Sequence, residues 1–451
     1  MAKDQKVIIV GAGLVGSLWA ILMARRGYQV SVYERRGDMR SAGFIGGRSI
    51  NLAMSDRGWK ALEKAGVSEK IKAVAIPMYG RMMHSEQGQL TFQPYGKEGQ
   101  AIYSVSRGGL NLELLRIGSQ FDNLRYYFNH PCKSVDFRQK TIKFEDKIAQ
   151  KKVEASADLI FGADGAFSAV RSSLQRLPRF NYAQNYLDYG YKELHIPPGP
   201  EGQHLIEKKA LHIWPRGRFM LIALPNPDGS FTCTLFLPYE GHEAFEKLQT
   251  DQDIEAFFVK HFPDALALMP TLLENFHQNP TGNLVTIRCN PWHFEDQVLL
   301  IGDASHAIVP FYGQGMNSGF EDCTILDEMM DDYQEDWSKI VPDFSQQRVK
   351  DANAIADLAL RNFVEMRDLV ADPKFLLRKK IASHLQDLHP GKFLPVYSMV
   401  TFSHLPYNKA LSASQAQDQL FEHILALDGI ENNWKNNPEV ERIFLQWLKE
   451  Q

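Results

Sequence analysis

Residues 7–36 read VIIVGAGLVGSLWAILMARRGYQVSVYERR, and this stretch decides the fold. Gly11, Gly13 and Gly16 form a G-x-G-x-x-G pattern directly after a β-branched run and at the start of a helical pattern. In such a turn the first glycine permits the tight bend, the second lets the backbone approach a pyrophosphate, and the third lets helix and strand pack closely. Glu34 closes the next strand pattern, where a carboxylate accepts hydrogen bonds from ribose hydroxyls. The stretch predicts a Rossmann-like unit that binds a dinucleotide.

This glycine pattern leaves two questions open. A similar turn occurs in α/β proteins that bind no dinucleotide, although the order of strand, helix, strand and acidic residue favours the dinucleotide. The N–H groups and the positive dipole end at the start of the helix suit the phosphates of NAD and of FAD equally. Because both cofactors contain ADP, residues 7–36 do not distinguish between them.

Two later stretches favour FAD. Residues 159–171, LIFGADGAFSAVR, end a strand pattern at a D-G pair that contains Asp164. Residues 298–322 end another strand pattern at a G-D pair that contains Asp303. A carboxylate at such a strand end suits a hydroxyl of the ribityl chain, which FAD has and NAD lacks.

A glycine-rich turn then precedes a further helical pattern. The first N–H groups of that helix would stabilise negative charge on a reduced flavin ring. We therefore expect the cofactor to contact Gly315, Met316 and Asn317.

With these three motifs in this order, the chain resembles the class A flavoprotein aromatic hydroxylases, the p-hydroxybenzoate hydroxylase-like family. The resemblance implies an α/β fold, in which a Rossmann-like FAD-binding domain is interleaved with a β-rich substrate domain and followed by a helical C-terminal part. It also implies FAD as cofactor, O2 as oxidant, and NADPH as the usual electron donor, docked without a Rossmann unit of its own. The chemistry would then belong to the flavin, so neither a catalytic side chain nor a metal site is predicted.

Longer strings resemble the members of this family that hydroxylate L-kynurenine at the ring position ortho to its amine. They include GRSINLAMSDRG at 47–58, IPMYGRMMHS at 76–85 and RNFVEMR at 361–367. Carried over by position, the resemblance implies a binding site for the substrate carboxylate at Arg81, Tyr95, Asn362 and Tyr397. It implies further FAD contacts at Val15, Arg35, Ala53, Arg107 and Cys132.

Arg81 alone has two interpretations. On a strand it would share a face with Tyr79 and Met83, because side chains alternate between the two faces. An arginine on such an apolar face either extends its aliphatic stem to solvent or binds an anion from outside the protein. The planar guanidinium matches a carboxylate bidentately, which suits an amino-acid substrate.

Other candidate residues also have two interpretations. Each tyrosine, taken singly, is typical of a packing residue with a hydrogen-bonded tip, and Asn362 within a helix could face solvent. His306, close to Asp303, could act as a base, although we favour packing behind the flavin. The aromatic ring of the substrate would lie against apolar residues, namely Ile222, Leu224, Phe236, Pro310 and Phe311.

Composition narrows the remaining possibilities. The 451 residues carry a net charge of −4, which gives no reason to expect a nucleic-acid partner. The four cysteines form no C-x-x-C pair, as is typical of a reducing compartment. We find no signal peptide, no apolar run of about 20 residues and no hydrophobic C-terminal extension such as the eukaryotic members have. We therefore expect a cytoplasmic enzyme without a membrane anchor, and its oligomeric state is not predicted.

The order of patterns predicts three parts of the chain. A strand-rich middle begins near residue 180, a helix covers 56–65 after a possible N-cap at Ser55, and an amphipathic helix near the C-terminus docks on its own protein. The FAD-binding domain is predicted at 1–75, 100–180 and 286–370, the substrate domain at 76–99 and 181–285, and the helical part at 371–451. Two alternative functions stay open: a hydroxylase of another aromatic acid, and a non-catalytic flavin-binding redox protein.

Overall fold

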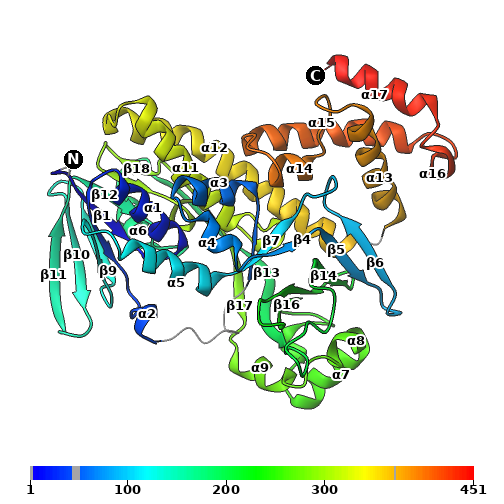
Figure 1. The fold of residues 1–451 in the computed structure, drawn as a ribbon, viewed down its shortest axis with the longest axis horizontal. Helices are drawn as coiled ribbons and strands as arrows, with labels where there is room; N and C mark the ends of the chain where they lie inside the picture. The colour runs from blue at the N-terminus through cyan, green and yellow to red at the C-terminus, as the bar shows by residue number, and fades with distance from the viewer. Residues whose placement is uncertain (1–3, 43–50, 370–371, 451) are drawn as a thin grey trace.

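A six-stranded, mostly parallel sheet forms the first half of the molecule (Figure 1). The computed structural model describes residues 4–42, 51–369 and 372–450, so part of the string at 47–58 lies outside the described residues. The apolar run of the first strand is buried on both faces, as is typical of a parallel sheet covered by helices. In spatial order the strands are β18 (His293–Phe294), β19 (Val298–Leu300), β12 (Leu159–Gly162), β1 (Lys6–Val10), β2 (Gln29–Tyr33) and β8 (Leu124–Tyr127).

Helices pack on this sheet and position the motifs. The helix after the glycine turn, α1 (Leu14–Arg25), packs between α5 (Arg107–Gly118) and α11 (Gly315–Asp332). The predicted helix at 56–65 is α3 (Asp56–Lys64); Ser55 is its N-cap residue, but the Ser55 side chain makes no capping hydrogen bond. The shorter helices of this half are α2 (Met39–Ala42), α4 (Ser68–Lys72), α6 (Ala169–Leu174), α10 (Asp303–His306) and the 3-10 turn η2 (Pro310–Tyr312).

Two three-stranded sheets flank the first half. One is exposed at its far edge and contains β9 (Cys132–Asp136), β10 (Thr141–Asp146) and β11 (Lys151–Ser156). The other bridges toward the second half and contains β3 (Asn51–Met54), β7 (Ile102–Ser106) and β4 (Ile76–Met78).

A seven-stranded sheet forms the second half and confirms the predicted strand-rich middle. Neighbouring strands are antiparallel except for β14 and β5, which are parallel. In spatial order they are β17 (Gly282–Asn290), β13 (Asn181–Ile196), β16 (Phe231–Pro238), β15 (Met220–Pro225), β14 (Ala210–Pro215), β5 (Gly80–His84) and β6 (Leu90–Pro94).

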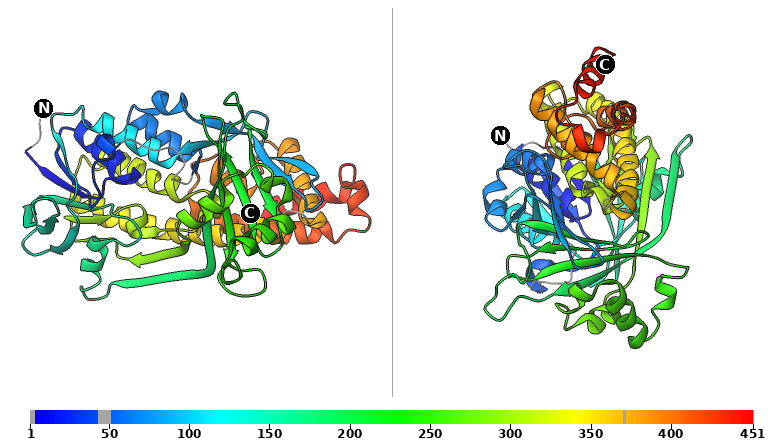
Figure 2. Two further views of the ribbon diagram at one scale, coloured as in Figure 1. Left: turned by 90° about the horizontal axis from the view of Figure 1, so that it is seen from below. Right: turned by 90° about the vertical axis from the view of Figure 1, so that its right-hand side faces the viewer.

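The two faces of this sheet belong to different cores. On β15, Leu221 and Ala223 pack toward the helices that cover one face, whereas Met220 and Leu224 point into a separate cluster. The covering helices are η1 (Phe245–Lys247), α7 (Asp251–His261), α8 (Pro263–Leu266) and α9 (Leu272–Gln278). The right-hand view in Figure 2 shows these helices at the opposite end of the molecule from the C-terminal helices.

The C-terminal part is helical, as predicted. The long helix α12 (Trp337–Val364) continues into a π-helical segment, η3 (Glu365–Leu369). Within the described ranges no helix has both the length and the apolar character needed to cross a membrane. The last helix packs on its own protein, as predicted, and Trp447 Nε1 donates to the Ala416 backbone oxygen at 3.1 Å. The remaining helices are α13 (Pro373–Leu388), α14 (Val396–Thr401), α15 (Tyr407–Leu425), α16 (Ile430–Asn433) and α17 (Pro438–Glu450).

Candidate active site

The G-x-G-x-x-G turn between β1 and α1 has the shape that a pyrophosphate requires. Gly11 has a φ of +104°, and a Cβ added there would lie 2.4 Å from the Ala163 backbone oxygen. A Cβ added at Gly16 would lie 2.1 Å from the Gly11 oxygen, so neither position admits a side chain. At Gly13 an added Cβ would meet no atom of the described chain within 4 Å. Because α1 also begins without a side-chain cap, its first N–H groups are available to phosphate oxygens.

The buried carboxylate of Glu34 lies beside this turn. Its Oε2 accepts from the Ala12 N–H at 2.9 Å, and its Oε1 accepts from the backbone N–H and the Nε of Arg36 at 3.0 and 2.8 Å. Burial opposes the charge, but the hydrogen bonds from Arg36 and Ala12 outweigh burial and hold the pKa of Glu34 below its usual value. An ionised carboxylate has further lone pairs for ribose hydroxyls, so these residues fit the adenosine half of FAD. The adjacent Arg35 side chain is exposed.

Val15 brings the first motif against the G-D motif. A Cβ added at Gly302 or at Gly319 would lie 3.0 or 2.6 Å from the Val15 side chain. Gly302 has a φ of +60°, which turns the chain from β19 into α10. Asp303 follows with an exposed side chain, so its carboxylate is accessible at this turn.

Asp164 in the D-G motif has a different role from Asp303. Its Oδ2 accepts from the Ala169 N–H at 2.7 Å and its Oδ1 accepts from the Ser168 hydroxyl, so the carboxylate holds the start of α6. Burial raises the pKa of Asp164 despite these bonds. Burial and the charge of Asp164 also raise the pKa of Cys132 to about 12, which keeps this thiol protonated.

Asn317 fixes the glycine-rich turn through its side chain, a role that the sequence did not reveal. Its Nδ2 donates to the backbone oxygens of Ala53 and Gly313, both at 2.8 Å, and its Oδ1 accepts from the Ser55 N–H at 2.9 Å. Gly313 has a φ of +70° and a Cβ added there would lie 3.1 Å from Ala53. The predicted contacts Ala53, Gly315, Met316 and Asn317 are thus adjacent in space.

Arg107 lies where the two halves of the molecule meet. It is the first residue of α5, and its side chain is exposed. Its charge opposes the rise that burial causes in the pKa of Tyr191 on β13. A cation at this position faces the region between the FAD-binding sheet and the seven-stranded sheet.

His306 is a packed core residue. Its Nε2 lies 2.6 Å from Asp322 Oδ2, and its ring stacks on Trp292 with centroids 5.0 Å apart. Asp322 also accepts from the Gly302 N–H and from Arg348 Nε, both at 2.9 Å. Burial opposes the charge of Asp322, but His306 and Arg348 outweigh burial and hold its pKa low. His306 therefore stabilises the G-D motif from behind, as favoured from the sequence, and a catalytic-base role has no support here.

Arg81 is buried beside a pair of stacked tyrosine rings. Its side chain is 5% exposed, and its guanidinium carbon lies 5.5 Å from the centre of the Tyr95 ring and 5.3 Å from that of the Tyr397 ring. The two rings stack on each other at 5.3 Å and 8°. Within the described part of the chain, Arg81 forms no ion pair, and its Nε and the buried Tyr95 hydroxyl have no hydrogen-bond partner.

The electrostatics of this cluster favour a bound anion. Burial disfavours the charge on Arg81, but Tyr397, Tyr95 and Glu365 outweigh burial and raise its pKa above the usual value. Burial likewise raises the pKa of Tyr95, so its hydroxyl keeps its proton. Arg81 is thus a permanent cation that forms no ion pair, and the Tyr95 hydroxyl is a donor without a partner. An anion bound beside them would gain charge-assisted hydrogen bonds.

The fourth predicted substrate residue, Asn362, belongs to the same apolar cluster but forms no hydrogen bond with Arg81. Its Nδ2 donates to the Phe311 backbone oxygen at 2.7 Å. Phe311 packs against Phe236 at 4.9 Å and stacks on Phe363 at 4.1 Å. Of the predicted ring-binding residues, Pro310 is exposed, whereas Leu224, Phe236 and Phe311 are buried and Ile222 packs against them.

Tyr312 is a site residue that the sequence reasoning missed. Its ring stacks on Tyr397 at 5.6 Å and 15°, which extends the tyrosine stack toward the glycine-rich turn. Burial raises its pKa well above the usual value. Its place directly before Gly313 was the signal that could have identified it, because that turn was already predicted to contact the flavin.

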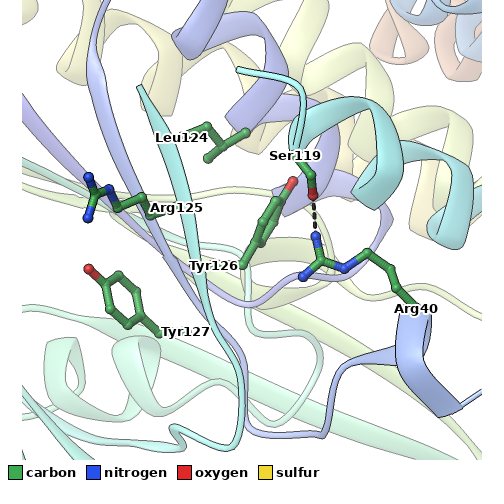
Figure 3. Close-up of a pocket in the computed structure, with 6 residues that line it drawn as sticks. All are labelled: Arg40, Ser119, Leu124, Arg125, Tyr126 and Tyr127. Atoms are coloured by element: carbon green, nitrogen blue, oxygen red, sulfur yellow. Dashed lines mark hydrogen bonds between the residues drawn. The ribbon is translucent and has the colours of Figure 1, made fainter. Parts of the chain in front are cut away.

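A separate surface pocket lies at the β8 edge of the FAD-binding sheet and shares no residue with the predicted site. Its volume is about 330 Å³, and in Figure 3 the Arg40 guanidinium donates to Ser119 Oγ across it. Asp38 neutralises Arg40 with an ion pair of 2.6 Å. The pocket is lined by Arg40, Ser119, Leu124, Arg125, Tyr126 and Tyr127.

Comparisons with known proteins agree with this geometry. Residues 4–330 match the family model described as FAD binding domain. A protein of Flavobacterium johnsoniae named kynurenine 3-monooxygenase is 49% identical over 100% of both chains. Proteins of the same name from Myxococcus xanthus and Sus scrofa are 48% and 44% identical, and the matches cover 94% and 95% of this chain and 91% and 90% of theirs.

Solved structures share the fold at low sequence identity. A 2-methyl-3-hydroxypyridine-5-carboxylic acid oxygenase superposes with a TM-score of 0.66 at 18% identity, covering 82% of this chain and 95% of that one. A p-nitrophenol 4-monooxygenase from Pseudomonas putida superposes with a TM-score of 0.65 at 16% identity, covering 93% and 98%. Both likenesses support the two-sheet architecture that was predicted.

Proposed function

This chain belongs to the kynurenine 3-monooxygenase family of FAD-binding proteins, and on that premise we propose that it hydroxylates L-kynurenine. One oxygen atom of O2 is added to the ring carbon ortho to the amine, and the other leaves as water. NADPH supplies the two electrons, and the organic product is 3-hydroxykynurenine. The relatives named above, from bacteria to a mammal, support this proposal.

The chain provides the site for FAD. The turn at Gly11–Gly16 and the start of α1 would hold the pyrophosphate, Glu34 and Arg35 the adenosine half, and Asp303 the ribityl chain. The flavin would lie against residues from several elements and would supply the activation of O2 that no side chain can perform. The proposed contacts around the flavin are Val15, Ala53, Arg107, Cys132, Gly315, Met316 and Asn317.

The observation that carries the substrate assignment is the buried Arg81, which forms no ion pair with the described residues and whose Nε has no hydrogen-bond partner there. L-kynurenine has an amino-acid carboxylate at one end and an aniline ring at the other. The carboxylate would accept hydrogen bonds from Arg81 and from the Tyr95 and Tyr397 hydroxyls. The ring would then extend into the apolar cluster around Phe236 and Phe311, where orientation and the exclusion of water favour the reaction.

The arrangement also agrees with the absence of a predicted acid–base pair. In an aniline the amine itself donates electron density to the ortho carbon, so that carbon needs no side chain to activate it. The charged groups of this site would bind the substrate and not activate it. Arg81 would hold the carboxylate, and Glu365, which Arg361 contacts at 3.3 Å, helps to raise the pKa of Arg81. Orientation is therefore the main contribution of these residues.

A comparison of two ligands tests this proposal. Purified, FAD-loaded protein is supplied with NADPH and either L-kynurenine or kynuramine, which has the same ring but no carboxylate. We expect rapid NADPH oxidation and hydroxylated product with L-kynurenine, and a KM raised at least tenfold with kynuramine. Equal KM values would contradict the role of Arg81. Turnover with a different aromatic acid alone would favour another hydroxylase, and yellow protein inactive with every acid would favour a redox protein.

We also propose a cytoplasmic location and a small-molecule substrate as the main partner. The four cysteines among the described residues are unpaired, as is typical of proteins in a reducing compartment. Thiol titration of protein isolated from the native cell would test the location, because disulfide-bonded protein would contradict it.

A further inference from the structure

A chain of hydrogen bonds crosses the back of the seven-stranded sheet, on the face opposite Arg81. Asp264 Oδ2 lies 2.9 Å from His84 Nδ1, and His84 Nε2 lies 2.9 Å from His212 Nδ1. His212 Nε2 lies 2.7 Å from the Glu207 backbone oxygen. We call these four groups the His84 relay. Both imidazoles are buried, and Asp264 reaches solvent at one end.

The geometry of the His84 relay fixes its proton count. The Glu207 carbonyl only accepts, so His212 Nε2 carries a proton. Asp264 Oδ2 already accepts from Trp214 Nε1 at 2.8 Å, and a carboxylate only accepts, so His84 Nδ1 carries a proton as well. One further proton must lie between His84 Nε2 and His212 Nδ1, since two lone pairs at 2.9 Å would repel. Each of the three contacts of the relay is therefore a hydrogen bond.

The surroundings fix the state of the groups at both ends of the relay. Burial lowers the pKa of His212 to about 4, so His212 is neutral at physiological pH. Burial opposes the charge of Asp264, but the hydrogen bonds from His84 and Trp214 outweigh it and hold the pKa of Asp264 at about 2. An ionised carboxylate therefore faces His84 directly and accepts from its Nδ1–H.

Other charged groups around His84 come from several elements. Arg216, after β14, donates from Nη1 to the His84 backbone oxygen at 3.0 Å and from Nε to the His261 backbone oxygen at 2.6 Å. His261 on α7 pairs with Glu243 at 2.7 Å rather than with the relay. The ring of His84 also stacks on Trp214 at 3.9 Å and 24°, a contact that favours a cation. The titratable groups facing the relay are thus Asp264, His212, Arg216, Glu86, Glu207 and His261.

The position of the relay connects it to the substrate site. Arg81 and His84 are both on β5, and Tyr95 directly follows β6. The β5–β6 hairpin therefore carries two of the three residues proposed to bind the carboxylate, and Tyr397 is the third. In the sheet order this hairpin is an edge unit, and β5 joins the other strands through its parallel pairing with β14. The His84–His212 bond links the side chains of these two strands, and Asp264 adds a link to α8.

We propose that His84 is a positioning residue for the substrate: its two ring hydrogen bonds, to Asp264 and to His212, fix the β5–β6 hairpin, and with it Arg81 and Tyr95, against the sheet. This inference rests on the proposed function for the identity of the ligand, but the hydrogen bonds of His84 do not. Loss of these two bonds leaves the hairpin held less firmly. Substrate affinity then decreases, while turnover of bound substrate changes little.

The first test uses the wild-type enzyme. In 15N-histidine-labelled, FAD-loaded protein, we expect a proton on His84 Nδ1 and on His212 Nε2, and a scalar coupling across the bond between His84 Nε2 and His212 Nδ1. Absence of this coupling in the folded enzyme would overturn the inference, because the two strands would then not be joined through these side chains.

The second test uses variants. His84→Phe keeps the stack on Trp214 and removes both hydrogen bonds; we expect a Kd for L-kynurenine raised about tenfold, with kcat changed less than about twofold. Asp264→Ala removes the link to α8, so the Kd for L-kynurenine should rise as well, by less than in His84→Phe, which loses both ring hydrogen bonds. His277→Phe on α9 is the matched control, because it removes an exposed histidine–aspartate pair of 2.7 Å from the same half. Equal affinity of His84→Phe and His277→Phe would overturn the inference, whereas a wild-type enzyme that ignores L-kynurenine would refute the proposed function instead.

Discussion

Replacement of Arg81 by methionine should weaken substrate binding strongly and lower the stability of the free protein slightly. Methionine keeps the length of the aliphatic stem and removes the charge. The lost interaction with a buried carboxylate corresponds to two charge-assisted hydrogen bonds at ~1.5 kcal/mol each, or ~3 kcal/mol in all. That is roughly a 100-fold rise in the Kd for L-kynurenine.

The charge of Arg81 also contributes to stability. Burial disfavours this charge, but Tyr397, Tyr95 and Glu365 outweigh burial and raise its pKa, and the two tyrosine rings contribute ~1–2 kcal/mol by cation–π contact. We therefore expect Arg81→Met to lower the free energy of unfolding by ~1 kcal/mol.

Calorimetric binding and thermal unfolding of the FAD-loaded protein, each with and without L-kynurenine, measure both effects. The matched control is Arg26→Met, which removes an arginine paired with Asp327 at 2.7 Å and Asp331 at 2.8 Å. The control should lower stability and leave the Kd unchanged. An Arg81→Met variant that binds L-kynurenine normally would refute the reasoning.

Four further predictions concern the cofactor site and the core. Asn317→Ala removes the three hydrogen bonds of this buried side chain, so the free energy of unfolding should decrease by ~2–4 kcal/mol. The variant should also retain less flavin, measured from absorbance after gel filtration, and full flavin content would contradict this. Glu34→Gln keeps the shape but not the charge, and we expect a Kd for FAD raised about tenfold by fluorescence titration, against no change if the carboxylate is only structural. Burial raises the pKa of Cys132 and of Cys289 to about 12, so both thiols should resist iodoacetamide at pH 8 until the protein unfolds, and rapid labelling of folded protein would be a counterexample. The pKa of Asp322 is lowered, so its contribution to stability is complete above about pH 4 and is lost as the pH falls further; the stability difference between wild type and Asp322→Asn should shrink in acid, and a difference that is constant from neutral pH downward would disprove the linkage.

Local sequence patterns predicted the elements that hold the cofactor. The glycines of the first turn are needed where added side chains would collide with the backbone, so their spacing alone indicates the geometry. The alternating strands of the middle segment were readable for a similar reason, because each places alternate residues in different cores.

Properties that arise from tertiary contacts were not readable. From the sequence, Arg81 could either reach solvent or bind an anion. Its burial beside Tyr95 and Tyr397 excludes the first interpretation. The two D-motif aspartates looked equivalent, yet Asp164 is occupied by the start of α6 and Asp303 is exposed. Side chains distant in sequence determine each of these outcomes.

The His84 relay shows the same limit more strongly. His84, His212 and Asp264 are separated by long stretches of chain, and no spacing rule connects them. The predicted domain boundaries and the roles of the individual site residues stay predictions.

Product analysis in 18O2 tests the central claim most directly. The FAD-loaded protein is mixed with L-kynurenine, NADPH and 18O2, and the product is separated and its mass is measured by mass spectrometry. We predict 3-hydroxykynurenine that contains one 18O atom, formed in equal amount to the NADPH consumed. NADPH consumption that yields only hydrogen peroxide, or a product hydroxylated at another ring position, would contradict the account.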